Sequence, residues 1–187
     1  MGMSLPGVEW TAERLRRIPD DGRRYEIVDG VLLVTPSHAF VHQRAVVRLS
    51  DLLLEYADSL GLDLMTAPAD VAFSKRTVVQ PDLFVMPLSA TGQQAVQFGD
   101  VARLLLAVEV LSPGTARRDR ELKRDLYLRQ SVAEYWTVDP VARTIERWLS
   151  AHSQSEVFRD VMVWEPIPGR GGLTIDVREY FRRVYRE

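Results

Sequence analysis

Apolar residues near the start of the chain alternate with polar ones and predict a β-hairpin. Two short apolar runs, at 25–28 and 31–34, flank an Asp-Gly pair at 29–30. Such a pair favours the type I′ turn, which needs a positive φ at both central residues. Upstream, Thr11 is placed to cap a short helix that extends through Ile18, where a proline follows. We therefore expect a short helix and then a hairpin.

In the next segment the apolar residues recur every three or four positions, which is the period of an α-helix. They lie between 41 and 56, with Ser37 as the expected N-cap and Gly61 as the stop. We expect this helix to pack on a sheet. The first strands of that sheet are predicted at 63–74 and 78–86.

Strands and helices alternate through the central part of the chain. An apolar run at 104–108 leads into an acid, and a turn at 112–115 then opens a helix over 116–130. The remaining predicted elements are an antiparallel pair at 134–138 and 144–149, a strand near 156–164, a helix from about 176 and a loop over 87–100. This order predicts a single α/β (α+β) domain over residues 1–187, with a mixed central sheet flanked by helices.

The composition limits the class of protein without naming its chemistry. The 187 residues are 46% hydrophobic and 27% charged, which is typical of a globular protein with its own core. The chain has no cysteine, which excludes disulfides, zinc–thiolate sites and cysteine nucleophiles. We find neither a membrane-length apolar run nor a secretion signal, so we expect a cytoplasmic protein with no membrane partner. The net charge of -2 argues against a uniformly basic nucleic-acid binder.

Two acidic residues lie within apolar runs that are predicted as buried strands. Asp82 follows Pro81 and separates two such runs, and Glu109 ends a third. An ionised carboxylate in this setting has a large desolvation cost unless a cation or a strong donor compensates it. Mg²⁺ is commonly held by one or two carboxylates together with water and substrate phosphate. We therefore predict that Asp82 and Glu109 lie on adjacent strands and bind Mg²⁺ or Mn²⁺.

Asp119, Lys123 and Tyr127 are spaced four residues apart and share one face of the helix predicted over 116–130. Taken alone, the spacing indicates an ion pair between Asp119 and Lys123 on a solvated surface. The helix begins one tight turn after Glu109, however, so its first turns lie near the acids. In this second interpretation Lys123 projects into the same site, where an ammonium orients an attacking water or stabilises a pentacovalent phosphate.

Several motifs occur in a fixed order along the chain. They are Pro81-Asp82, Glu109-Val110-Leu111-Ser112-Pro113, the Asp119, Lys123 and Tyr127 spacing, and Glu134-Tyr135-Trp136-Thr137-Val138-Asp139-Pro140. Together with the segment at 25–30, this set resembles the bacterial Uma-two family of endonucleases, within the PD-(D/E)XK, restriction endonuclease-like superfamily. The resemblance covers roughly residues 10 to 185. It implies a four-stranded mixed core sheet flanked by helices, a magnesium-type site and nuclease chemistry.

The resemblance also assigns roles to single residues, and one position departs from it. The superfamily places a lysine two residues after the acid, where this chain has Leu111. The resemblance implies that Lys123 takes that role, because the lysine stem is long and only the placement of the ammonium matters. It implies a further acid from an early element, Glu26, although alternation in the hairpin equally allows Glu26 to face solvent. The Val110 carbonyl is predicted as an extra metal ligand.

Other polar and aromatic residues have both a functional and a structural interpretation. His38 and His42 have a metal-binding spacing, but with no third nitrogen or thiolate nearby a capping or indirect role is favoured. Gln80 is either a donor in the site wall or a strand-edge residue. Trp136 and Trp148 either stack on bases or belong to the core. The predicted phosphate contacts are the helix arginines Arg117, Arg118, Arg120 and Arg124.

These features favour a metal-dependent endonuclease that hydrolyses DNA. We expect a homodimer, because the aromatic strands over 134–149 exceed what a small core needs and two copies suit the cutting of two strands. One alternative is a non-catalytic nucleic-acid-binding or assembly module on the same fold, which Leu111 favours. Another is an RNA nuclease, which would use the same site.

Overall fold

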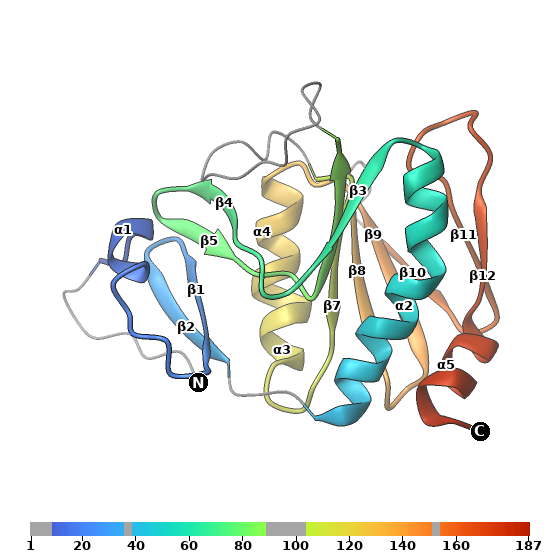
Figure 1. The fold of residues 1–187 in the computed structure, drawn as a ribbon, viewed down its shortest axis with the longest axis horizontal. Helices are drawn as coiled ribbons and strands as arrows, with labels where there is room; N and C mark the ends of the chain where they lie inside the picture. Colours follow the sequence, from blue (N-terminus) through green and yellow to red (C-terminus); the bar gives the residue numbers. More distant parts are fainter. Residues whose placement is uncertain (1–8, 36–38, 89–103, 151–153) are drawn as a thin grey trace.

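A six-stranded mixed sheet forms the centre of the computed structural model, which describes residues 9–35, 39–88, 104–150 and 154–187. In spatial order its strands are β10 (Ser155–Phe158), β9 (Thr144–Leu149), β8 (Glu134–Asp139), β7 (Leu106–Val110), β6 (Leu83–Pro87) and β3 (Leu62–Thr66). β7 and β8 run parallel, and the other neighbours in this sheet run antiparallel. Helices flank the sheet, which confirms the predicted fold class (Figure 1). The sheet has six strands rather than the four that the resemblance implied.

A helical crossover joins β7 to β8, as a parallel pair of strands requires. It consists of α3 (Ala116–Arg118), the π-helical turn η1 (Asp119–Lys123) and α4 (Arg124–Arg129). The single helix predicted over 116–130 is therefore interrupted by a wider turn. Thr115 stands at the predicted N-cap position, although its side chain makes no capping hydrogen bond.

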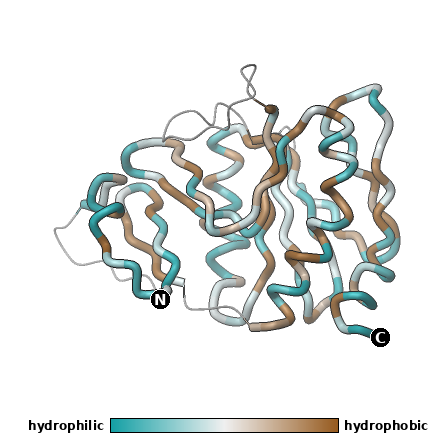
Figure 2. Tube along the Cα trace, viewed as in Figure 1, coloured by the Kyte–Doolittle hydropathy of each residue, from teal (hydrophilic) through white to brown (hydrophobic). Residues whose placement is uncertain are grey.

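Successive residues of the central strands face two different cores, because side chains alternate along a strand. The first core lies under α2 (Phe40–Ser59) and α5 (Val177–Tyr185) and includes the strand residues Val85, Val108, Trp136 and Val138. The second lies under α4 and includes Phe84, Ala107, Tyr135 and Tyr127. Figure 2 shows the apolar residues concentrated along the central strands. Since Tyr135 and Trp136 are buried within one chain, they provide no surface for an interface, and the homodimer stays a prediction.

The predicted hairpin belongs to a second, smaller sheet beside the helical crossover (Figure 1). In spatial order its strands are β2 (Val31–Thr35), β1 (Arg24–Val28), β5 (Thr77–Val79) and β4 (Val71–Ser74). Asp29 and Gly30 have φ angles of 51° and 83°, as the predicted turn requires. Thr11 caps α1 (Ala12–Leu15), which packs on this sheet but ends before the predicted Ile18.

The two strands predicted at 63–74 and 78–86 are each divided into two shorter strands. Segment 63–74 forms β3 and β4, and segment 78–86 forms β5 and β6, so each contributes to both sheets. Pro68 and Pro81 lie between the halves. Proline has no amide donor for a strand ladder, which explains why pairing stops there.

The strand predicted near 156–164 is also divided. β10 pairs with β9, whereas β11 (Val161–Trp164) pairs with β12 (Leu173–Asp176), a strand that the pattern did not predict. Asp176 ends β12 and caps α5 by accepting from the Glu179 amide at 2.8 Å, so the closing helix begins where it was predicted.

The long helix α2 ends as predicted but begins later. Gly61 follows its last turn with a φ of 68°, in the left-handed region that glycine adopts readily. The N-cap position is Ala39, and the predicted cap Ser37 lies outside the described residues, as does His38. Within the described part of the chain, no helix is long and apolar enough to cross a lipid bilayer.

Candidate active site

Asp82 and Glu109 are brought together by the pairing of β6 with β7. Leu83 lies opposite Val108 in this antiparallel pair, so the same register places Asp82 opposite Glu109. Both acids are buried, with exposed fractions of 3% and 1%. The two adjacent strands therefore hold the two acids side by side, at the end of the pair where β6 begins.

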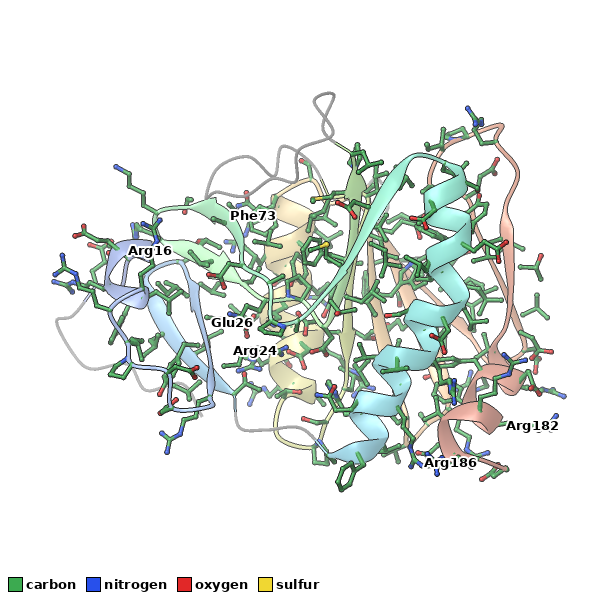
Figure 3. The ribbon with its side chains drawn as sticks, in the orientation of Figure 1. Arg16, Arg24, Glu26, Phe73, Arg182 and Arg186 are labelled. Carbon is green, nitrogen blue, oxygen red and sulfur yellow. The ribbon has the colours of Figure 1, made fainter. Side chains whose placement is uncertain are left out.

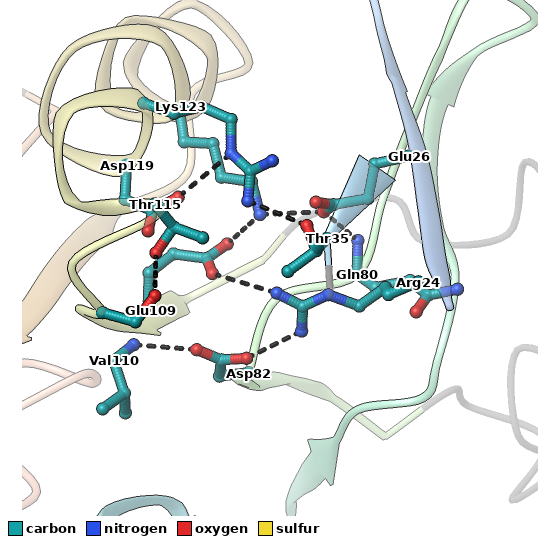
Figure 4. A network of polar contacts seen from close by, with 12 residues as sticks. Arg24, Glu26, Thr35, Gln80, Asp82, Glu109, Val110, Thr115, Asp119 and Lys123 are labelled. Atoms are coloured by element: carbon teal, nitrogen blue, oxygen red, sulfur yellow. Dashed lines mark hydrogen bonds and ion pairs between the residues drawn. The ribbon is translucent and has the colours of Figure 1, made fainter. Parts of the chain in front are cut away.

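Hydrogen-bond donors surround the Asp82 carboxylate (Figure 4). Its Oδ1 accepts from the Arg24 guanidinium at 2.7 Å. Its Oδ2 accepts from the Val110 backbone amide at 2.8 Å and contacts His42 Nε2 at 3.0 Å. Burial alone would raise the pKa of Asp82, but the His42 hydrogen bond and the Arg24 charge outweigh burial and hold this pKa well below its usual range.

The Glu109 carboxylate contacts donors from the helical crossover. Its Oε1 accepts from the Lys123 ammonium at 2.7 Å and from the Tyr127 hydroxyl at 3.0 Å. Its Oε2 lies 3.9 Å from Arg24 Nη2. Burial raises the pKa of Glu109 to about 8; the Lys123 ammonium opposes this shift and the Asp82 carboxylate adds to it. The cations around Glu109 therefore do not fully compensate its burial.

Lys123 is completely buried, and its ammonium joins two acids. It donates to Glu109 and, at 2.8 Å, to Glu26 Oε1. Burial opposes the charged form, but Glu109 and Glu26 raise the pKa of Lys123, so the ammonium persists. The predicted face of Asp119, Lys123 and Tyr127 thus lies against the sheet and not in solvent. Two of these residues belong to the π-helical turn, a feature frequent at functional sites.

Glu26 faces inward from β1, so the interpretation of a solvent-facing residue is wrong. Its Oε1 also accepts from the Gln80 backbone amide at 2.8 Å, and its Oε2 has no hydrogen-bond partner among the described residues. Burial opposes ionisation, but the Lys123 and Arg24 charges prevail and lower the pKa of Glu26. The Gln80 side chain instead contacts Asp70, at 2.8 Å.

Arg24 is the residue of this cluster that sequence reasoning missed. Its side chain is 11% exposed and spans Asp82 and Glu109, the two acids predicted to hold a metal (Figure 4). Figure 3 shows Arg24 and Glu26 between the hairpin and the crossover. A signal was present in the sequence: residues two apart on a strand share a face, so an inward Glu26 implies an inward Arg24.

Asp119 lies behind Lys123 at the base of the cluster. Burial raises the pKa of Asp119, against the effect of the Lys123 charge. Its Oδ1 lies 3.6 Å from Arg118 Nε and accepts no hydrogen bond within the described part of the chain. Arg118 itself donates to Thr35 Oγ1 at 2.9 Å and so links the crossover to β2.

The arginines predicted to contact phosphates all have partners within the chain. Arg118 turns inward, whereas Arg117 pairs with Glu121 and Arg120 pairs with Asp139 on the surface. Arg124 pairs with Asp125, and its guanidinium lies 4.9 Å from the centre of the Trp148 ring. The basic face predicted for this helix is therefore largely neutralised, and Trp148 contacts protein.

A pocket of about 570 Å³ adjoins the acid cluster. Arg24, Asp82, His42 and Gln80 are among its lining residues, whereas Glu109 and Lys123 are not. Among the described residues, no group of three or more histidines and acids could hold a metal ion. Two carboxylates nonetheless fit a hard cation such as Mg²⁺, which often needs no more from the protein. Asp82 Oδ1 and Glu109 Oε2 are the oxygens that would serve, and both face Arg24.

The mixed sheet, with paired acids at the end of two of its strands and a crossover lysine that contacts one of them, is that of a restriction endonuclease-like protein. A model of the Uma2 family, described as "Putative restriction endonuclease", matches residues 12–178, and the chain belongs to this family. The fold is similar to the crystal structure of "a putative nuclease belonging to DUF820 from Anabaena variabilis". The TM-score is 0.77 at 16% identity, over 93% of this chain and 98% of the other. No curated protein matches. Membership of this family supports a nuclease, and the structural likeness shows the fold.

Proposed function

We propose that this protein is a metal-dependent endonuclease that hydrolyses DNA phosphodiester bonds. The juxtaposition of Asp82, Glu109 and Lys123 beside a pocket is the observation that carries the proposal. Family membership supports the same reaction class. Lys123 lies on the crossover rather than at position 111, yet its ammonium reaches Glu109 at 2.7 Å. The position of this lysine on the crossover is therefore compatible with a complete set of catalytic groups.

Asp82, Glu109 and the Val110 carbonyl would hold the cation, Mg²⁺ or Mn²⁺. When bound there, the cation supplies Lewis-acid activation of water and neutralises charge on the phosphate. The Val110 amide and His42 fix the Asp82 carboxylate from one side, so its other oxygen points to Arg24 and the pocket. This arrangement orients a ligand before any substrate arrives.

Lys123 would stabilise charge on the phosphate and orient the nucleophilic water. Glu26 holds its ammonium from the side opposite Glu109, so Glu26 serves the reaction through Lys123 rather than as a metal ligand. Tyr127 fixes the same Glu109 oxygen as Lys123 does, which leaves the second oxygen for the cation. A fixed ammonium needs little reorganisation during the reaction.

DNA is the proposed substrate, and the crossover arginines are its proposed phosphate contacts. Arg117 is the most accessible, with 90% of its side chain exposed, so its pair with Glu121 costs little to break. Arg120 and Arg124 would exchange Asp139 and Asp125 for phosphates. An inactive nucleic-acid-binding module is the alternative, because Arg24 occupies the oxygens that a cation needs and position 111 has no lysine.

Cleavage of plasmid DNA and of a matched RNA, with Mn²⁺ or with EDTA, tests the proposal. We expect Mn²⁺-dependent nicking of DNA, and a loss of at least ~100-fold in Lys123→Ala, on the scale of other electrostatic groups in active sites. Lys75→Ala is the matched control, because Lys75 is an exposed lysine in the turn between β4 and β5. Circular dichroism would verify that both variants fold, since Lys123 is buried.

The outcomes separate the alternatives. A loss in Lys123→Ala that persists at saturating DNA supports a catalytic role, whereas a loss that fades at high DNA concentration indicates affinity alone. Full activity of Lys123→Ala would show that the third group is misassigned. A wild-type protein that cleaves neither nucleic acid would favour the binding module, and one that prefers RNA would correct the substrate.

A further inference from the structure

Arg24 occupies the place where the proposed cation would contact the acids. Asp82 Oδ1 accepts from Arg24 at 2.7 Å, and Glu109 Oε2 lies 3.9 Å from it. Every other donor that contacts these two acids in the described residues uses the opposite oxygen of each carboxylate: Val110 and His42 on Asp82, and Lys123 and Tyr127 on Glu109. The guanidinium thus faces the one oxygen of each acid that is otherwise available.

A divalent cation and the Arg24 guanidinium would compete for these two oxygens. Two cations on one pair of carboxylates repel each other strongly at short distance and low dielectric. Binding of the cation would therefore favour movement of the guanidinium away from Asp82 and Glu109. The stem of Arg24 is long, and the adjoining pocket of about 570 Å³ offers space for it.

Arg24 also separates the pocket from half of the site. It lines the pocket together with Asp82 and contacts both acids, whereas Glu109 and Lys123 do not line the pocket. Movement of the guanidinium into the pocket would open Glu109 and Lys123 to a ligand there. A guanidinium in that position matches a phosphodiester, which it can bind through two hydrogen bonds.

From this geometry we infer that Arg24 is an exchangeable ligand of the active site. Without metal it holds Asp82 and Glu109 as an internal counter-ion and closes the site. When a divalent cation takes the two carboxylates, Arg24 turns into the pocket and binds the substrate phosphate. The inference rests on the proposed function, since it concerns the same two acids.

Opposite changes in metal and DNA affinity are the signature of this exchange. In Arg24→Met, which keeps most of the stem, we expect Mn²⁺ to bind at least about tenfold more tightly by calorimetry, equivalent to 1.4 kcal/mol. We expect a 20-base-pair duplex to bind at least about tenfold more weakly at saturating Ca²⁺, used in place of Mn²⁺. A residue with only a structural role would weaken both.

Arg23→Met is the matched control, because Arg23 is the neighbouring arginine and 63% of its side chain is exposed. It removes the same charge but should leave the Mn²⁺ affinity unchanged. If Arg24→Met does not fold, the ¹⁵Nε resonance of Arg24 in the wild-type protein provides the test. It should shift as Mg²⁺ is added, and a resonance that does not shift at saturation would overturn the inference.

The remaining outcomes are decisive as well. Unchanged or weaker Mn²⁺ binding in Arg24→Met overturns the exchange, as does unchanged DNA binding. Should these results accompany Mn²⁺-dependent cleavage by the wild type, the exchange fails while the proposed function stands. Should both affinities change as expected in a protein that cleaves nothing, the exchange stands and the proposed catalysis fails.

Discussion

The two faces of the central sheet bury very different groups. Under α2 and α5 the contacts are apolar, and Trp136, Trp164 and Phe181 are buried almost completely. Under the helical crossover, Glu109 and Lys123 are buried just as deeply. An apolar side chain contributes about 1.5–3 kcal/mol when buried. A buried ion has a desolvation cost of several kcal/mol, which its partners offset only when their geometry is good. Both faces therefore have an apolar core that stabilises the fold, but only the crossover face also buries ions, which are stable only as a complete set of charges.

Removing a large side chain from the apolar face should have the largest effect. Trp136→Ala should lower the free energy of unfolding by about 3–5 kcal/mol, because the residue is fully buried and its neighbours cannot fill the space. Urea denaturation measures this loss. Val141→Ala, in the turn that follows the same strand and 86% exposed, should change stability by no more than about 0.5 kcal/mol. Similar losses in both variants would contradict the assignment of the core.

On the charged face, a combined change should be less harmful than the single change it contains. Lys123→Met leaves Glu26 and Glu109 buried without their cation and should cost about 3 kcal/mol or more. The triple variant with Glu26→Gln and Glu109→Gln removes the unpaired charges as well. Its stability should recover by about 2 kcal/mol relative to Lys123→Met, although it should cleave no DNA. A triple variant less stable than the single one would show that these charges stabilise the fold directly.

The sequence was more informative about the charged face than about the arrangement of strands. Asp82 and Glu109 could be predicted because a carboxylate in an apolar run needs a compensating partner. Lys123 could be predicted from its spacing and from the short turn after β7. Arg24 shares a strand face with Glu26 but was missed, because the sequence alone does not show which face of the hairpin meets the central sheet. The division of segment 63–74 between two sheets likewise depends on long-range pairing that local periodicity does not record.

The charged face should also respond to metal. Mg²⁺ or Mn²⁺ at about a hundred times its Kd should stabilise the wild type by about 2.7 kcal/mol, seen as a rise in melting temperature. Asp82→Ala should abolish this rise, because it removes one of the two proposed carboxylate ligands, whereas Val141→Ala should retain it. Equal rises in melting temperature in the wild type and in Asp82→Ala would show that the metal does not bind these two acids.

The smallest expected effect concerns one of the contacts between the helical crossover and the hairpin. Arg118 donates to Thr35 Oγ1 at 2.9 Å, with only 17% of its side chain exposed, so Arg118→Met should cost about 1.5 kcal/mol. Arg117→Met should cost less than about 1 kcal/mol, because its pair with Glu121 is on the surface. Hydrogen exchange would locate the Arg118 effect: amides of β2 should exchange faster while those of β8 do not. Equal acceleration in both strands would mean that the hairpin and the central sheet open together, and that Arg118 stabilises the whole fold rather than this contact.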